Sequence, residues 1–444
     1  MAENPYMYHN PISDPARFAG RTAALQFMQT HLVTGAPGQP RGALALLGSP
    51  QIGKSSLLRV LRFHLDARYC PVRVSLRAGT VAGEAAWLTA LAQTIPDALE
   101  LLDIQSARLP SLPGRAAELR TALLGEYLTA GLHAMRQGRQ LLVLVDNADR
   151  LLTAVERGAL PGDSFELLGQ LLDVHPNLHL LFALDARFEA DLLAAGPPFE
   201  AALCYRLGPL PRDEHNRLLL DPVAGTLAYT PEALDTLYDL TGGHPYLANV
   251  IAHQLFDWSE ARGHGEPVGV ADVEAAVEPA LNQAADVLGA TWRDGSTQAQ
   301  LVLTALTALC PDEPPAPVRH DDIAAWLLAV NRPLDPRSVN ATWRQLEYEG
   351  VLALSGEGKL IIRGGLQRRW LRGHVDLPRA GAPAASWQRI GVLALVALVV
   401  VVLLLALLAI LPGPGAGEGA GSAATITLDF DLQATTDAYN ATQT

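Results

Sequence analysis

The stretch GSPQIGKSS at residues 48–56 has the residue types and the spacing of a phosphate-binding loop. Gly48, Gly53, Lys54 and Ser55 fit the pattern G-x-x-x-x-G-K-[ST]. Glycines let backbone N–H groups curl around a phosphate, and a helix that begins at the loop adds the positive end of its dipole. Lys54 is one of two lysines among 33 basic residues, and its compact ammonium suits phosphate oxygens better than the wide fork of arginine. The stretch therefore predicts a nucleotide phosphate site.

The whole loop takes part in this predicted site, with Lys54 at the β and γ phosphate oxygens. Its backbone and side chains would surround the phosphates, which is the role that glycine-rich loops have at helix N-termini. The nucleotide-binding residues that we expect in the loop are Gly48, Ser49, Pro50, Gln51, Ile52, Gly53, Lys54, Ser55 and Ser56.

A second motif, LLVLVDNAD, predicts the metal partner of the loop. The apolar residues 141–145 suit a buried strand, and Asp146 follows directly at its end. A carboxylate placed there lies beside the phosphate loop and binds Mg²⁺ through water, while the Ser55 hydroxyl also reaches the ion. The alternative, an aspartate that caps the next helix, is favoured only if the phosphate loop is absent. We therefore expect Ser55 and Asp146 to hold Mg²⁺.

Short apolar runs alternate with stretches long enough for helices in the first half of the chain. This alternation is typical of a buried parallel sheet with crossover helices. We expect the phosphate loop to join the first strand to the helical stretch SSLLRVLRFHL. The strand candidates lie at 43–47, 72–76, 141–145 and 178–184.

Helical periodicity replaces the strand pattern from residue 209 to about residue 290 and predicts a helical subdomain. Three further helix candidates follow, at 297–309, 320–328 and 336–349. The next stretch, VLALSGEGKLIIRGG, has two short apolar runs around a Gly-Glu-Gly turn and predicts a β-hairpin. Three helices and a hairpin together predict a winged helix.

The helix candidate at 336–349 bears on a DNA partner. It carries two arginines and two glutamates, so it presents no net positive stripe to phosphates. Val339, Trp343 and Leu346 recur on one of its faces, as an ordinary core stripe or a protein-binding surface would. The overall net charge of −13 also opposes sequence-independent binding to nucleic acid. We expect the winged helix to pack against protein and do not expect a DNA partner.

Residues 390–411 form an apolar run without one polar side chain. As a helix the run would span ~33 Å, about the thickness of a bilayer core, which predicts one transmembrane helix. The alternative is a buried core helix. Arg372, Arg379 and Arg389 precede the run and no Lys or Arg follows it, so the N-terminal part is expected inside the cell. The expected location is the cytoplasmic membrane, crossed once, with the C-terminus outside.

Other composition features narrow the class of protein. The 444-residue chain is 49% hydrophobic and long enough for two or three packed domains. Its three cysteines, Cys70, Cys204 and Cys310, have no ligand-like or disulfide-like spacing and are interpreted as core residues. The expected fold class is α/β, a P-loop NTPase parallel sheet with a helical lid subdomain, a winged-helix domain and a single transmembrane helix. The expected boundaries are an N-terminal segment 1–40, P-loop core 41–208, helical lid 209–292, winged helix 293–374, linker 375–389, transmembrane helix 390–411 and flexible tail 412–444.

From about residue 5 to residue 372 the chain resembles the STAND branch of the P-loop ATPases related to AAA+ proteins, with origin-recognition-like and archaeal ATPase modules as near relatives. The resemblance rests on NPISDPARFAGR, the phosphate loop, VLVD, TGGHPYLANVIAHQL and the winged helix ending in LQRRWL. It implies that Gly20 and Arg21 lie near the adenine and that His244 and Pro245 face the base. It also implies that Arg187, in FALDAR, lies where a polar or arginine sensor follows the fourth strand. The implied cofactors are ATP and Mg²⁺.

One position departs from the hydrolysing relatives. They carry an acidic residue, usually Glu, after the Mg²⁺ aspartate to polarise the attacking water, and this chain has Asn147 there. An amide does not accept a proton, and Asp149, two residues further on, is the alternative acid. The resemblance thus assigns catalytic positions to Lys54, Asp146, Asn147, Asp149 and Arg187, with slow turnover expected. Alone, Arg187 could be a surface arginine and 242–243 a helix break.

These features favour a membrane-anchored ATP-binding regulatory switch that signals by nucleotide-dependent assembly with a protein partner or with itself. One alternative is an origin-recognition-like DNA-binding ATPase that uses its winged helix. Another is a membrane adaptor whose nucleotide is a permanent structural cofactor. Salt-dependent DNA binding would select the first alternative, and failure to exchange nucleotide the second.

Overall fold

The computed structural model describes residues 3–33, 42–104, 109–135, 138–263, 265–310, 316–355 and 358–378. All of these residues belong to one compact unit, Met1–Ala382. None of the helices in these ranges is long and apolar enough to cross a bilayer. The expected transmembrane helix 390–411 and tail 412–444 lie outside the described residues.

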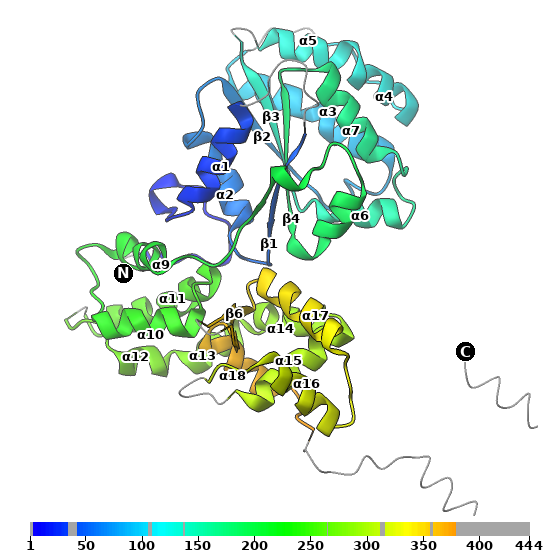
Figure 1. Ribbon diagram of the computed structural model, residues 1–444. Coiled ribbons are helices and arrows are strands. Elements are labelled where there is room, and N and C mark those ends of the chain that lie inside the picture. The colour runs from blue at the N-terminus through cyan, green and yellow to red at the C-terminus, as the bar shows by residue number, and fades with distance from the viewer. Residues whose placement is uncertain are drawn as a thin grey trace, which may run out of the picture. The chain divides into compact units, whose positions relative to one another are not determined.

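A five-stranded parallel sheet forms the centre of the first half of the chain (Figure 1). The strand order β2-β3-β4-β1-β5 places β1 between β4 and β5, and each pair is parallel, which confirms the predicted parallel sheet. The edge strand β5 was not predicted. It has only three residues, Cys204–Arg206, and none of them is fully buried, so the sequence shows no apolar run there. The strands are β1 (Leu44–Gly48), β2 (Tyr69–Ser75), β3 (Gln140–Asp146), β4 (Leu178–Asp185) and β5 (Cys204–Arg206).

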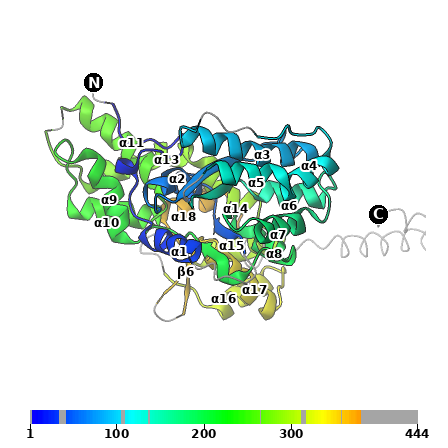
Figure 2. The ribbon, with the colours of Figure 1, turned by 90° about the horizontal axis from the view of Figure 1, so that it is seen from above.

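Two layers of helices cover the sheet, because alternate residues of each buried strand point to opposite faces (Figures 1 and 2). Leu44 and Leu46 pack with α1 (Thr22–Val33) and α2 (Lys54–Val60) on one face. Ala45 and Leu47 contribute to the core of the other face. The helices of that second face are α3 (Glu84–Leu101), α4 (Ala116–Leu124), α5 (Glu126–Ala134), α6 (Asp149–Glu156) and α7 (Ser164–Val174). The short α8 (Glu189–Ala194) follows β4.

The second half of the described chain is mostly helical and has one continuous hydrophobic core. Helix α10 begins at Pro231 after the capping Thr230 side chain and ends at Gly242, which adopts φ 59°. Gly242 and Gly243 therefore break the helix before α11 starts at Pro245. The helices are α9 (Arg212–Leu220), α10 (Pro231–Thr241), α11 (Pro245–Ala261), α12 (Val270–Ala275), α13 (Val277–Gln283) and α14 (Ala285–Arg293).

The three helix candidates after residue 293 are confirmed, and the predicted hairpin follows them as an antiparallel pair. Val339 and Leu346 are buried in the same core as the preceding helices, and Trp343 packs against it, so their stripe is a core stripe. The elements are α15 (Thr297–Leu309), α16 (His320–Ala329), α17 (Pro336–Tyr348), β6 (Leu352–Leu354), β7 (Leu360–Ile362) and α18 (Gly365–His374). Short 3-10 turns lie at Pro15–Arg17, Leu61–Phe63, Ala186–Phe188, Ala201–Leu203 and Asp221–Val223.

Candidate nucleotide site

The predicted phosphate loop joins the end of β1 to the start of α2, as the sequence implies. Gly53 precedes the helix with φ 105°, a conformation that favours glycine. Gly48 is required for a different reason, because a Cβ there would lie 2.8 Å from Ile52 Cγ2 and 2.9 Å from the Leu207 carbonyl oxygen. The two glycines therefore let the loop turn tightly and place the N-terminus of α2 toward the cleft.

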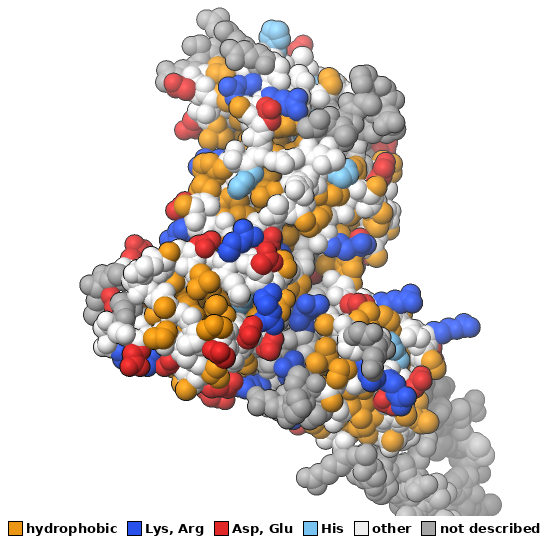
Figure 3. Space-filling view, turned by 60° about the vertical axis from the view of Figure 1, so that its left-hand side comes forward, with side chains coloured by type: hydrophobic (Ala, Val, Ile, Leu, Met, Phe, Trp, Pro, Cys, Tyr) orange, Lys and Arg blue, Asp and Glu red, His pale blue; other side chains and the backbone are white. Residues whose placement is uncertain are grey.

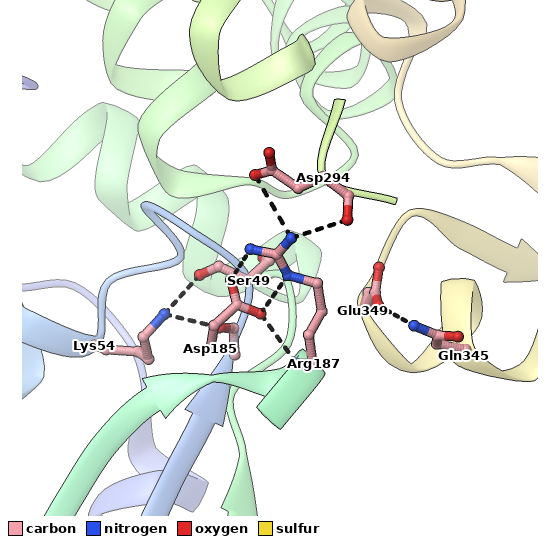
Figure 4. A network of polar contacts seen from close by, with 8 residues as sticks. Ser49, Lys54, Asp185, Arg187, Asp294, Gln345 and Glu349 are labelled. Atoms are coloured by element: carbon pink, nitrogen blue, oxygen red, sulfur yellow. Dashed lines mark hydrogen bonds and ion pairs between the residues drawn. The ribbon is translucent and has the colours of Figure 1, made fainter. Parts of the chain in front are cut away.

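Lys54 closes the loop on itself (Figure 4). Its ammonium donates to the carbonyl oxygens of Gly48, at 2.7 Å, and of Ser49, at 2.9 Å. Burial lowers the pKa of Lys54, whereas the nearby carboxylates of Asp185 and Asp149 raise it. A buried ammonium held by neutral carbonyls is well suited to exchange them for phosphate oxygens, which carry the opposite charge.

The two expected metal ligands lie together. Ser55 Oγ donates to Asp146 Oδ1 over 3.0 Å, and the Asp146 side chain is 4% exposed. Among the described residues, no cluster of three or more His, Cys, Asp or Glu is placed to hold a metal ion. One hydroxyl and one carboxylate are oxygen ligands of the kind that Mg²⁺ uses together with substrate phosphates and water. The donor set therefore fits Mg²⁺ that arrives with a nucleotide.

A contact that the sequence did not predict completes this group. Arg73, on β2, lies with its guanidinium 3.4 Å from Asp146 Oδ2. Strands β2 and β3 are parallel neighbours in which Ser75 pairs with Asp146, so Arg73 is two residues back along the neighbouring strand. Both carboxylate oxygens of Asp146 thus have a partner, Ser55 on one side and Arg73 on the other.

Asn147 and Asp149 both line the cleft. Asn147 is exposed and has φ 60°, a left-handed conformation that asparagine tolerates. Asp149 is the first residue of α6. Burial raises the pKa of the Asp149 carboxyl, and Asp185 acts in the same direction while Lys54 lowers it. Asp149 therefore has the carboxyl group that can accept a proton near Asn147, which supplies only an amide.

Arg187 connects the end of β4 with the helical half of the chain (Figure 4). Its guanidinium lies 3.1 Å from Asp185 Oδ2 and 3.5 Å from Asp294 Oδ2. Asp185 pairs with Gly48 in the β4–β1 ladder, so it lies next to the phosphate loop. Arg187 and Asp185 both line the cleft. Sequence reasoning missed Asp185, although its place at the end of a buried apolar run was the same signal that identified Asp146.

Gly20 and Arg21 form a tight turn against Glu214 of α9. The Arg21 backbone N–H donates to Glu214 Oε2 over 2.9 Å, and a Cβ on Gly20 would lie 2.4 Å from that oxygen. The Arg21 guanidinium donates to the carbonyl oxygens of Gly208 and Ile52, both at 2.5 Å. Burial lowers the pKa of Arg21 to about 10. Arg21 thus ties the N-terminal segment to the phosphate loop, and it lines the cleft.

The expected pair His244 and Pro245 is divided. Pro245 lines the cleft. His244 hydrogen-bonds the Pro50 backbone and lines a second, smaller pocket with Ser49, Pro50 and Ile52. Its Nδ1 is buried without a hydrogen-bond partner among the described residues. Burial lowers the pKa of His244 to about 4. Pro245 thus lies where the resemblance expects it, at the cleft, whereas His244 contacts the phosphate loop through the Pro50 backbone.

A cleft of about 500 Å³ is lined by many of these residues, among them Arg21, Lys54, Ser55, Asn147, Asp149, Asp185, Arg187 and Pro245. Its lining does not include Gly20, Gly48, Ser49, Arg73, Asp146 or His244. Among the expected loop residues, Ser56 Oγ accepts a hydrogen bond from the Ile12 N–H at 3.0 Å, which ties the N-terminal segment to α2. Gln51 has a left-handed backbone conformation, with φ 61°. The N-terminal residues 7–12 also form a wall, which the sequence did not predict in detail. The remaining lining residues include Phe18, Ala19, Pro50, Ile52, Gly53, Phe188, Leu210, Leu218, Tyr246 and Asn249.

No protein-family model and no curated protein matches this chain. Among solved structures, the chain is similar to a Walker-type ATPase of Pyrococcus abyssi, with a TM-score of 0.57 and 15% identity over 83% of this chain and 99% of that one. It is also similar to the ORC2 protein of Aeropyrum pernix in ADPNP-ADP complexes, with a TM-score of 0.54 and 14% identity over 83% of this chain and 96% of that one. At these identities the likeness shows the fold, which is that of a P-loop NTPase.

Proposed function

We propose that this chain is an AAA+-related ATP-binding switch of the STAND type. The observation that carries the proposal is the group formed by Lys54, Ser55 and Asp146 at the carboxyl ends of β1 and β3. A loop that ends in an ammonium, next to a hydroxyl and a carboxylate, matches the charges of a nucleotide triphosphate with Mg²⁺. The ADPNP-ADP complexes of the similar ORC2 protein support an adenine nucleotide. Calorimetry with ATP on the full-length chain tests the proposal, and absence of binding contradicts it.

The proposed switch works through residues that join the two halves of the cleft. Arg187 contacts Asp185 beside the phosphate loop and Asp294 at the end of α14. Tyr348, at the end of α17, donates to Glu189 of α8, and Arg206 stacks over its ring at 4.4 Å. In the proposed switch these contacts are made in one arrangement of the two halves and broken in another. A nucleotide shifts the equilibrium between the two arrangements only if it binds them with different affinity. Arg187, which lines the cleft, is the residue through which phosphates would act on these contacts.

We propose slow hydrolysis. Ser55 and Asp146 would hold Mg²⁺, which would supply neutralising charge to the phosphates. The protein's part is to bind the phosphates with Lys54 and to accept a proton from the attacking water. Asn147 has no basic oxygen for that proton, and Asp149, the first residue of α6, lies two residues further along the chain. Single-turnover measurements with ATP and Mg²⁺ separate slow chemistry from slow nucleotide release.

A second candidate function is a DNA-binding ATPase. Arg337 and Arg344 of α17 are both exposed, so the helix that would enter the groove in a DNA-binding winged helix carries two exposed cations. Figure 3 shows basic and acidic side chains interspersed on the described part of one face, which is less favourable for a duplex. Titration of the full-length chain with duplex DNA at physiological salt, with and without ATP, decides between the two functions.

Membrane anchoring is proposed from the apolar run at 390–411 and the arginines before it. Residues before 389 would then be cytoplasmic and residues 412–444 outside the cell. Reporter fusions at Arg379 and at Gly421 test this topology. An Arg379 fusion that reports export contradicts it, and equal cytoplasmic signals from both fusions show that the run does not cross the membrane.

A further inference from the structure

We infer that Arg73 competes with Mg²⁺ for the Asp146 carboxylate, so that ATP binding at this site depends less on Mg²⁺ than it would without Arg73. The inference rests on the proposed ATP binding and concerns a residue that the phosphate-loop motifs do not include. It follows from the contacts of the buried Asp146 carboxylate, and it makes ATP binding less dependent on the Mg²⁺ in solution.

The buried Asp146 carboxylate has two partners within the protein. Its side chain is 4% exposed, and a buried carboxylate is costly unless a countercharge and hydrogen bonds satisfy it. Ser55 supplies one neutral hydrogen bond at Oδ1. Arg73 supplies the countercharge at Oδ2, at 3.4 Å. The carboxylate is therefore neutralised by the protein itself before any metal ion arrives.

The position of Arg73 beside Asp146 follows from the register of the sheet. It lies on β2, the edge strand next to β3, and its side chain is 35% exposed. Because side chains alternate along a strand and Ser75 pairs with Asp146, Arg73 and Asp146 lie on the same face of the sheet. That face is covered by α2, which carries Ser55. The sheet register thus fixes the guanidinium beside the carboxylate.

Arg73 and Mg²⁺ compete for the Asp146 carboxylate. A Mg²⁺ ion that uses Asp146 must share the carboxylate with a guanidinium, and two cations at one carboxylate repel each other. Removing Arg73 frees Oδ2 and strengthens Mg²⁺ binding. In the absence of metal the same change leaves a bare carboxylate near the phosphates, which weakens ATP binding. Arg73 therefore has opposite effects on ATP affinity with and without the metal.

The experiment measures ATP affinity of the full-length chain by calorimetry in excess EDTA and in excess Mg²⁺. In the unmodified protein we expect the two dissociation constants to lie close together. For Arg73→Gln we expect ATP affinity in EDTA to fall about tenfold, as befits a lost charge-assisted contact, and affinity in Mg²⁺ to stay equal or rise. The Mg²⁺ concentration for half-maximal effect should fall as well. Arg73→Lys keeps the charge and should retain most of the original behaviour.

Arg68→Gln is the matched control, because Arg68 precedes the opposite end of β2 and pairs with Asp66 at 3.9 Å. It removes one positive charge far from Asp146 and should leave both affinities unchanged. Equal metal dependence in Arg73→Gln and the unmodified protein overturns the inference. So does loss of ATP affinity by about a hundredfold when Mg²⁺ is removed from the unmodified protein, a result that needs no variant to fold. Absence of ATP binding under every condition instead overturns the proposed function together with the inference.

Discussion

Arg187 and Asp294 form an ion pair of 3.5 Å although 107 residues separate them in the chain. Arg187 follows the end of β4, and Asp294 follows the last residue of α14. The same guanidinium contacts Asp185, which is the neighbour of Gly48 in the sheet. A single side chain thus reaches from beside the phosphate loop to the helical half of the molecule.

Asp294→Asn should weaken this connection without unfolding the protein. The two side chains are 31% and 51% exposed, so the pair is worth at most about 1 kcal/mol of unfolding free energy. We expect ATP to slow hydrogen exchange at residues 285–293 in the unmodified protein and to slow it less in the variant. Asp286→Asn is the control, since that fully exposed carboxylate pairs with Arg293 inside α14 itself. Equal protection by ATP in all three proteins contradicts a coupling role.

Lys54→Ala should weaken ATP binding by tenfold or more, because the loop loses the cation that lies at the phosphates and charged hydrogen bonds are worth ~1.5–3 kcal/mol. Lys359→Ala is a natural control, as it removes the second lysine of the chain from the hairpin after β6. Calorimetry measures both variants. The assignment of Lys54 fails if its removal has no more effect than the removal of Lys359.

Asn147→Glu should raise kcat about tenfold or more, since a positioned general base contributes ~10²–10⁴ in rate. Steady-state release of phosphate from ATP gives the rate, and calorimetry verifies that ATP still binds. Asp149→Asn is the companion variant. If Asn147→Glu leaves the rate unchanged while Asp149→Asn abolishes it, then Asp149 is the base and the missing acid is not limiting.

Gly20→Ala should destabilise the protein more than Gly138→Ala. Both glycines have positive φ, 74° and 68°, so both substitutions carry the left-handed penalty of ~1–2 kcal/mol. Gly20 faces an obstacle, because its Cβ would meet the Glu214 carboxylate at 2.4 Å. At Gly138, none of the described residues comes within 4 Å of an added Cβ. Urea unfolding of the two variants measures the difference. Equal losses would show that Glu214 moves aside freely.

The sequence predicted the parts of the fold that repeat a simple pattern. Runs such as LLVLV are apolar on both sides because both faces of a parallel sheet are covered, and the helices at 297–309 and 336–349 show clear periodicity. β5 escaped notice because it is short and only partly buried, and its pairing with β1 depends on residues more than 150 positions away.

The candidate site divides in the same way. Loop residues such as Lys54 are local in sequence, so a motif finds them. The place of Arg73 depends on the register between β2 and β3, which no local pattern specifies. His244 and Pro245 were assigned to the base together by the resemblance, and the contact of His244 with the Pro50 backbone was not predicted. Side-chain direction at a helix start depends on packing that adjacent residues do not reveal.

Tyr6 has a consequence for the order in which the molecule is completed during synthesis. Its side chain is fully buried, and its hydroxyl donates to the Leu219 carbonyl oxygen at 2.5 Å and lies 3.1 Å from the Tyr229 hydroxyl. Those partners are translated 213 and 223 residues after it. The five-stranded sheet can assemble on the ribosome before the partners of Tyr6, which are Leu219 of α9 and Tyr229, have been translated. Residues 7–12, which follow Tyr6 and wall the cleft, are therefore seated late, so a nascent chain has its phosphate loop well before it has an enclosed nucleotide pocket.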